Sequence, residues 1–273
     1  MKIIVEAGGT KCKWGLIGSN LQTIETQGFN PNSSNVGALA AMAESVSAKT
    51  TDKIGSIIYF GAGCSNIANK KTVGDALSAV FKCGDVHVFT DLEGAAIALF
   101  GNQPGIAAIL GTGAAAGYYN GKEIELQAPS LGYLLGDEGS GAYIGKTLIA
   151  KVLRNEFSED LYKKFFDFAK TTPAELIKNI YSAQPVNAYL ANFVQFASEN
   201  IAEPEIADLI TNAFSTFHSK HIEPLNISNM PIGFVGGVAW QFADILRKQY
   251  FQCGIQIRIV KDAFSRLCEL QNA

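Results

Sequence analysis

The sequence is poor in charge and has no cluster of basic residues. Charged residues make up 17% of the 273 residues, the formal net charge is −3, and Lys and Arg form no run. A nucleic-acid-binding surface needs clustered basic side chains, so this composition argues against that class of partner. The apolar share of 48% predicts instead an α/β protein with a well-buried core.

Closely spaced metal ligands are also missing. The five cysteines contain no CxxC pair, which argues against a structural zinc site or an iron–sulfur cluster and predicts reduced thiols. They are Cys12, Cys64, Cys83, Cys253 and Cys268. The histidines have no spacing typical of a metal site or a nucleophile. We expect His87, His218 and His221 to be surface residues.

No apolar stretch approaches the roughly 20 residues that a membrane-spanning helix needs. The N-terminus runs directly into an apolar strand pattern, without a charged leader and an apolar signal core. We therefore expect a cytoplasmic protein without a membrane partner. The length predicts one large domain or two lobes.

A strand, a glycine turn and a second strand occur twice along the chain. The first copy has apolar runs at 2–5 and 12–17, and the second has them at 105–110 and 114–119. A strong hairpin signal, Asn120-Gly121, follows the second copy. Strands and helices alternate after the first copy and again near the end of the chain. This pattern predicts an internal duplication of a β-meander followed by βαβ units.

The remaining segments follow from apolar periodicity and turn signals. Further strands are predicted over 24–26, 54–60, 86–90, 123–126, 232–235 and 255–260. Helices are predicted over 36–48, 68–81, 92–100, 239–250 and 263–270, and most of 140–225 is also helical. A domain boundary is expected near 100–105.

Three glycine segments lie where a backbone could approach a phosphate closely, at 8–10, 111–113 and 236–237. Glycine presents no side chain, so backbone amides can point at phosphate oxygens. The alternatives are a tight hairpin that needs glycine for its shape and, for one of Gly236 and Gly237, close packing of a helix on a strand. Three such segments with carboxylates between them predict a nucleotide held between two similar halves, as in a phosphotransferase or an ATPase.

Several carboxylates stand near these segments. Glu6 precedes the first turn, where it could hold a metal ion through water or be a solvated edge residue. Asp91 follows the strand 86–90 and could accept a proton from an alcohol, or could cap the next helix. Asp137 and Glu138 stand between glycines ahead of a helix, where a surface turn is the alternative.

Together these segments resemble the N-acetylglucosamine kinase/BadF-type ATPase family, in the superfamily of actin, sugar kinases and heat-shock ATPases. The resemblance covers nearly the full chain in the order of the family's motifs. The first phosphate motif is matched by Glu6-Ala7-Gly8-Gly9-Thr10-Lys11, the segment with the catalytic aspartate by Thr90-Asp91, the second phosphate motif by Leu110-Gly111-Thr112-Gly113, and the adenosine motif by Val235-Gly236-Gly237-Val238. The most family-specific match is Gly136-Asp137-Glu138-Gly139-Ser140-Gly141.

The resemblance implies two ribonuclease-H-like lobes, each a mixed five-stranded sheet with helices, and a cleft between them for ATP and Mg²⁺. The N-terminal lobe would comprise 1–101 with a C-terminal helix at about 262–273. The C-terminal lobe would comprise 102–261, including the helical segment 140–225. A homodimer is common in the resembling family.

The resemblance also implies roles for single residues. Asp91 would accept the proton of a sugar hydroxyl, and Glu6 would hold the metal through water. ATP would contact Gly8, Gly9, Thr10, Lys11, Gly111, Thr112, Gly113, Gly236 and Gly237. The sugar would contact Asn30, Ala114, Ala115, Ser130, Leu131, Gly132 and Asp137.

The chain departs from the family pattern at three of these positions. The family usually has Asp in place of Glu6, and it has Ser and often Asn in place of Ala114 and Ala115. We expect an ATP-dependent kinase for a sugar, most simply an amino sugar such as N-acetylglucosamine. The alternatives are an ATPase that activates a partner enzyme and a sugar or nucleotide sensor without turnover.

Overall fold

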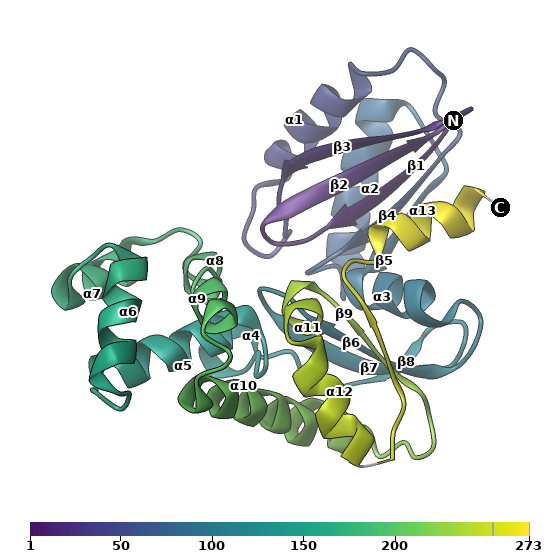
Figure 1. The fold of residues 1–273 in the computed structure, drawn as a ribbon. Helices are drawn as coiled ribbons and strands as arrows, with labels where there is room; N and C mark the ends of the chain where they lie inside the picture. The colour runs from purple at the N-terminus through teal and green to yellow at the C-terminus, as the bar shows by residue number, and fades with distance from the viewer. Residues whose placement is uncertain (253, 273) are drawn as a thin grey trace. The chain divides into compact units, whose positions relative to one another are not determined.

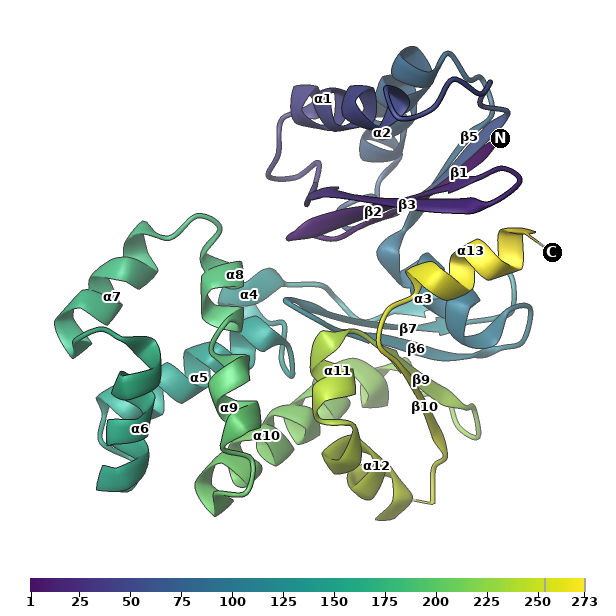
Figure 2. The ribbon, with the colours of Figure 1, turned by 45° about the horizontal axis from the view of Figure 1, so that its top comes forward.

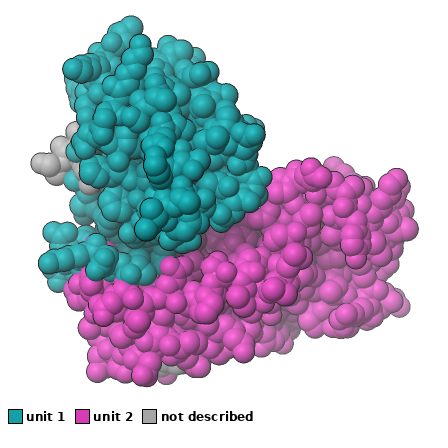
Figure 3. Space-filling model, turned by 180° about the vertical axis from the view of Figure 1, so that it is seen from behind, with its two compact units in different colours: residues 1–103, 121–124, 262–273 teal, residues 104–120, 125–261 magenta. Residues whose placement is uncertain are grey.

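The computed structural model of the chain describes residues 1–252 and 254–272. It divides into two compact units, which Figure 3 shows in different colours. Unit 1 comprises 1–103, 121–124 and the residues from Asp262 on, so it uses both ends of the chain. Unit 2 comprises 104–120 and 125–261.

The sheet of unit 1 has five strands in the order β3-β2-β1-β4-β5 (Figure 1). The strands are β1 (Lys2–Ala7), β2 (Lys11–Ile17), β3 (Leu21–Gln27), β4 (Ser56–Gly61) and β5 (Val86–Thr90). The first three strands form an antiparallel meander, and β4 pairs in parallel with both β1 and β5. The strand predicted over 24–26 corresponds to β3, which is longer than predicted.

Helices cover both faces of this sheet (Figure 2). They are α1 (Val36–Ser47), α2 (Ile67–Phe81), α3 (Asp91–Phe100) and α13 (Phe264–Asn272). Alternate residues of β1, Ile3 and Val5, join Trp14 and the buried sides of α1 and α2 in one core. Since successive strand residues point to opposite faces, Glu6 faces the other side, where α3 and α13 lie.

The sheet of unit 2 has the order β10-β9-β6-β7-β8, the same arrangement as in unit 1. Its strands are β6 (Gly105–Leu110), β7 (Ala114–Tyr119), β8 (Ile124–Gln127), β9 (Ile232–Val235) and β10 (Ile257–Val260). An antiparallel β6–β7 hairpin is again followed by parallel pairing, of β6 with β9 and of β9 with β10. The two mixed five-stranded sheets confirm the predicted fold class, and their common order bears out the predicted duplication.

Unit 2 also contains the long helical segment. Its helices are α4 (Gly132–Leu135), α5 (Gly141–Leu153), α6 (Glu159–Ala169), α7 (Pro173–Ser182), α8 (Val186–Ala191), α9 (Val194–Glu199), α10 (Pro204–Phe217), the π-helix η1 (His218–Ile222), the 3-10 helix η2 (Glu223–Leu225), α11 (Gly237–Gln241) and α12 (Ala243–Gln252). One core joins α5, α6 and α10 to the strands β6 and β9. The helix predicted over 239–250 is in fact two helices, which meet at Phe242.

Four of the five cysteines are buried free thiols, namely Cys12, Cys64, Cys83 and Cys268. Cys253 lies outside the described residues. Within the described part of the chain, no helix is long and apolar enough to cross a bilayer.

Candidate functional site

The first glycine turn joins β1 to β2 and is braced by the segment that follows β3. Gly28 donates its N–H to the Thr10 carbonyl at 3.0 Å, and Phe29 donates to the Gly8 carbonyl at 3.1 Å. A Cβ atom on Gly28 would lie only 2.5 Å from the Thr10 nitrogen, so close packing requires glycine there. The turn is therefore held from behind by backbone contacts.

Gly9 differs from Gly28, because no contact among the described residues requires a glycine at this position. Its φ lies outside the left-handed region, and a Cβ atom would meet no atom within 4 Å. The residue is also exposed. The alternative explanation, a glycine needed for the shape of the hairpin, therefore fails for Gly9, and an open backbone surface remains.

The neighbouring side chains of the first turn lie on the surface. Thr10 is exposed, and the side chain of Lys11 is 59% exposed. Lys11 forms a surface ion pair with Glu25 of β3 at 3.4 Å. Its predicted contact with ATP would compete with that pair.

The second glycine turn joins β6 to β7, the equivalent place in the sheet of unit 2. The start of α5 braces it, since Gly141 donates to the Gly111 carbonyl at 2.8 Å and Ala142 donates to the Thr112 carbonyl at 3.1 Å. As with Gly9, a Cβ atom on Gly111 would meet nothing within 4 Å, and its φ is not left-handed. The two repeated sheets thus each present one open glycine at the same turn.

The third segment contains one glycine that close packing requires and one that has open space beside it. Gly236 has a φ of +128°, and a Cβ atom there would collide with the Leu110 carbonyl of the neighbouring strand. Gly237, the first residue of α11, is exposed and has open space where a Cβ atom would stand. Close packing therefore explains Gly236, and Gly237 is the one that a ligand could approach.

Glu6 lies in a charged cluster of unit 1. It stands opposite Lys13 in the β1–β2 register, and Lys13 forms an ion pair of 3.2 Å with Asp262. Burial raises the pKa of Glu6 to about 7, although Lys13 and the backbone N–H of Ala263 favour its charged form. The charges of Asp262 and Asp91 add to the increase. Glu6 and Asp91 are thus close enough to influence each other electrostatically.

Asp91 is the first residue of α3, directly after β5. The helix cap is Thr90, whose hydroxyl accepts the Glu93 N–H at 3.1 Å, while Glu93 accepts the Thr90 N–H at 2.6 Å. This capping box uses Glu93 at the third helical position, so the alternative in which Asp91 caps the helix is wrong. The Asp91 carboxylate therefore takes no part in this capping box.

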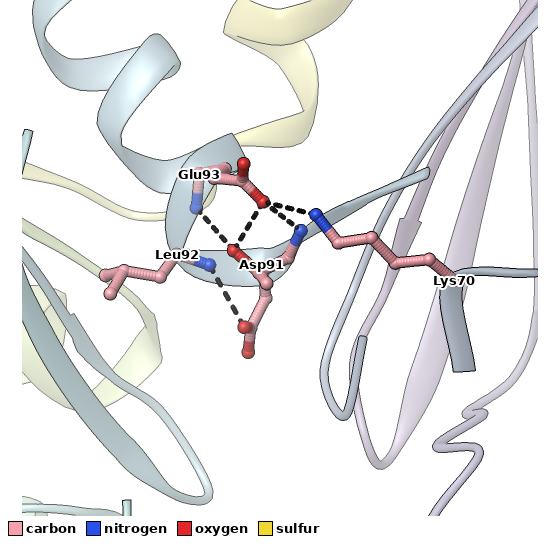
Figure 4. Close-up of polar contacts among 5 residues, drawn as sticks. Lys70, Asp91, Leu92 and Glu93 are labelled. Atoms are coloured by element: carbon pink, nitrogen blue, oxygen red, sulfur yellow. Dashed lines mark hydrogen bonds and ion pairs between the residues drawn. The ribbon is translucent and has the colours of Figure 1, made fainter. Parts of the chain in front are cut away.

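Figure 4 shows the Asp91 carboxylate pointing away from the Glu93 side chain and Lys70. Asp91 accepts the N–H of Leu92 at 3.0 Å, and Lys70 lies 3.5 Å from Glu93. Burial raises the pKa of Asp91, and the neighbouring charge of Glu93 raises it further. A carboxylate with a raised pKa is a stronger base than an ordinary aspartate.

The residues predicted to contact sugar fall in both units. In unit 1, Asn30 is half-buried beside the bracing segment, and its side chain accepts the Asn32 N–H at 2.9 Å. In unit 2, Ser130 and Leu131 are exposed ahead of α4, whereas Ala114 is 6% exposed. Gly132 has a φ of +69° and Ala115 is half-buried.

Asp137 is buried and lies against the second glycine turn. Its Oδ2 atom would be 3.0 Å from a Cβ atom on Gly113, so this glycine is a packing residue. Burial raises the pKa of Asp137, while a hydrogen bond from the Ala114 N–H and the nearby His221 lower it. The surface-turn alternative for this segment is wrong.

The structure also brings together two residues that the sequence did not connect. His221 Nε2 lies 3.0 Å from Glu138 Oε2, and the histidine side chain is only 5% exposed. His218, by contrast, contacts the Tyr250 hydroxyl at 3.0 Å and is half-buried. The prediction of surface histidines is therefore wrong for both, and it holds for the exposed His87. The cause is the packing of η1, which local spacing does not reveal.

The described residues include no group of three or more His, Cys, Asp or Glu side chains that could hold a metal ion by themselves. Glu6 and Asp91 could supply two oxygen ligands. Magnesium usually takes one or two carboxylates together with water and substrate phosphates, so this sparse set fits a metal that binds with a nucleotide.

Comparison with known proteins finds matches among solved structures. No family model and no curated protein matches the sequence. Among solved structures, a candidate N-acetylglucosamine kinase from Porphyromonas gingivalis is 29% identical, with a TM-score of 0.94 over 100% of this chain and 99% of the other.

Two further structures share the fold at lower identity. A candidate N-acetylglucosamine kinase from Chromobacterium violaceum is 22% identical, with a TM-score of 0.74 over 98% of each chain. A candidate N-acetylmannosamine kinase from Listeria monocytogenes is 14% identical, with a TM-score of 0.53 over 99% of this chain and 98% of the other. The chain is thus similar over its whole length to a candidate N-acetylglucosamine kinase, and it shares its two-sheet fold with these sugar-kinase structures.

Proposed function

We propose that this protein is an ATP-dependent kinase that phosphorylates a hydroxyl group of a sugar. The observation that carries the proposal is the pair of open glycines, Gly9 and Gly111, at the equivalent turn of two repeated sheets. Neither conformation nor packing requires glycine at these positions. Close approach of a polyphosphate to the backbone amides would explain both glycines.

Asp91 is the candidate general base. It stands at the carboxyl end of β5, its pKa is raised by burial, and Thr90 and Glu93 rather than Asp91 complete the helix cap. In phosphoryl transfer, an aspartate can accept the hydroxyl proton while the hydroxyl oxygen attacks the γ-phosphorus and ADP leaves. Asp91 would hold that proton on its carboxylate.

Glu6 would hold Mg²⁺ through a water molecule. When bound, the ion neutralises charge on the phosphates of the nucleotide. The burial of Glu6 favours its neutral form, and Lys13 opposes this effect. A bound cation would favour the charged form further, which fits a carboxylate that becomes a ligand only when metal and nucleotide arrive.

The substrate that we favour is an amino sugar such as N-acetylglucosamine, because the similar protein from Porphyromonas gingivalis is a candidate kinase for this sugar. Ala114 is almost fully buried and its N–H bonds to Asp137. Asp137, rather than a side chain at 114, would therefore supply the polar contact at this place. Gly237 at the start of α11 would lie against the adenosine.

The test is ADP release from ATP and Mg²⁺ with a panel that contains glucose, glucosamine, N-acetylglucosamine, N-acetylmannosamine and no sugar. We expect release that depends on one of the amino sugars and equals the amount of phosphorylated product. Release without sugar would favour an ATPase that acts on a partner enzyme. Nucleotide or sugar binding without release would favour a sensor, and either result would overturn the proposal.

A further inference from the structure

His221 is a buried histidine outside the residues assigned to the reaction. It lies in the π-helix η1 and is 4% exposed. Its ring stacks on Phe217, with centroids 4.9 Å apart and planes inclined by 19°. Short π-helical turns occur often at functional sites, but the ring contacts carry the inference that follows.

One ring nitrogen bonds across the unit to the family-specific segment. Nε2 lies 3.0 Å from Glu138 Oε2, a contact between residues 83 positions apart. An ionised carboxylate can only accept a hydrogen bond, so Nε2 carries the proton and donates it. Nδ1 is buried and has no hydrogen-bond partner within the described residues. The ring is thus oriented by a single polar contact and one stacking contact.

The segment that receives this hydrogen bond has a conformation that needs support. Asp137 adopts a φ of +55°, which is uncommon and costly for a residue with a side chain. Its carbonyl accepts the Ser140 N–H at 3.0 Å, and its carboxylate accepts the Ala114 N–H. Glu138 is the next residue along the chain, so its bond to His221 fixes the peptide beside Asp137.

Phe217 gives the same segment a second support. Gly139 has a φ of +76°, and a Cβ atom there would lie 2.9 Å from the Phe217 Cβ atom. The end of α10 and η1 therefore contact the segment twice, by packing at Gly139 and by a hydrogen bond at Glu138.

We infer that His221 is a positioning residue that, through Glu138, holds Asp137 against the second glycine turn. It does not touch the reacting groups. This inference deepens the proposed function and rests on it where it concerns sugar affinity. Loss of the hydrogen bond should weaken sugar binding at Asp137 and leave ATP binding at the glycine turns nearly unchanged.

Two variants separate the hydrogen bond from packing. His221→Phe keeps a ring that can stack on Phe217 but removes the donor. His221→Gln loses the ring but keeps an N–H donor near the position of Nε2. Because Nδ1 has no partner to lose, we expect the Phe variant to fold. The Glu138 side chain is 19% exposed, so water can reach it in that variant.

In steady-state kinetics, we expect His221→Phe to raise the sugar KM by about tenfold, the effect of one lost hydrogen bond to a charged group. The KM for ATP should stay within about twofold, and His221→Gln should stay near wild type. His218→Phe is the matched control, because it removes another histidine contact of η1, the one to Tyr250. It should change neither KM.

Hydrogen exchange of the backbone amides, measured on the ligand-free protein, gives a readout that is independent of activity. Amides of 136–141 should exchange faster in His221→Phe and at the wild-type rate in His221→Gln. Equal exchange in both variants, or a greater increase in the Gln variant, would overturn the inference. If no sugar is phosphorylated by the wild type, the proposed function fails, while the exchange result still decides whether His221 positions the segment.

Discussion

Lys13 and Asp262 form an ion pair with 3.2 Å between Nζ and Oδ2. The pair joins β2 to the segment that enters α13, and it lies beside the buried carboxylate of Glu6. Lys13 thus provides a positive charge for two carboxylates, Glu6 and Asp262, which lie far apart in the sequence. The Oδ1 atom of Asp262 is buried without a hydrogen-bond partner among the described residues, so Lys13 is an important counter-charge for this group.

Replacing this lysine should destabilise the protein more at high pH than at low pH. In Lys13→Met, both Glu6 and Asp262 lose their counter-charge above the Glu6 pKa of about 7. At pH 5 Glu6 is protonated and only Asp262 is affected. We expect a loss of about 2 kcal/mol in the free energy of unfolding at pH 8 and about half of that at pH 5. Urea unfolding at both pH values measures the difference, and an equal loss would contradict the shared role of Lys13.

Glu6 itself should make the wild type less stable as the pH rises. Its pKa is raised from 4.5 to about 7 in the folded protein, so the folded state binds more protons than the unfolded state between these values. The stabilisation is complete below about pH 4.5 and is lost as the pH rises through about 7. Its size is on the order of 3 kcal/mol.

The matched variant is Glu6→Gln, which has no titrating group at this position. The free energy of unfolding, measured by urea between pH 5 and 8, should fall more steeply for the wild type than for the variant. Parallel curves for the two proteins would show that Glu6 titrates as an ordinary exposed glutamate.

Substitution by alanine should have different effects on stability at glycines with open space beside them and at glycines that close packing requires. Gly9→Ala and Gly111→Ala place a methyl group in open space, so stability should be unchanged or slightly higher. Both should weaken ATP binding at least about tenfold, or about 1.4 kcal/mol, by blocking close approach of phosphate.

Gly28→Ala and Gly236→Ala are the contrasting pair, because a methyl group at either position meets a neighbouring backbone. They should lower the free energy of unfolding by about 1–3 kcal/mol. Calorimetric titration with ATP and thermal melting of all four variants provide both quantities. Unchanged ATP affinity in Gly9→Ala and Gly111→Ala would remove the main support for the phosphate-binding role.

Asp91→Asn should reduce turnover by about 10²- to 10⁴-fold, because asparagine cannot accept the hydroxyl proton. The amide oxygen can still accept the Leu92 N–H, so the start of α3 and the melting temperature should be preserved. Asp75→Asn is the control, since Asp75 is an exposed partner of Lys71 on α2. Full turnover in Asp91→Asn would mean that another group is the base.

Much of the fold could be predicted from the sequence because its strands are short apolar runs next to strong turn signals. The apolar runs on either side of Gly8-Gly9 and of Gly111 predicted the β1–β2 and β6–β7 hairpins. The third strand of unit 1, Leu21–Gln27, is mostly exposed and largely polar, so only its middle was recognised. The break at Phe242 has neither Gly nor Pro to mark it.

The site was less accessible to sequence reasoning, because its features depend on contacts between distant segments. Nothing local distinguishes Gly236, which packs on Leu110, from the open Gly237. Thr90 could be recognised as the helix cap from Glu93 three residues later, a signal that the sequence contained. The burial of His221 depends on Glu138 and Phe217, and no spacing along the chain encodes it.

The construction of unit 1 from both ends of the chain has a consequence for its synthesis. A ribosome delivers β1 and β2 first, and delivers Asp262, Ala263 and α13 only after all of unit 2. Until then, Glu6 lacks the N–H of Ala263, and the surface of β2 that will receive α13 is uncovered. A chain that terminates early would keep its first glycine turn but leave an acidic group and an apolar strand face open to chaperones and proteases.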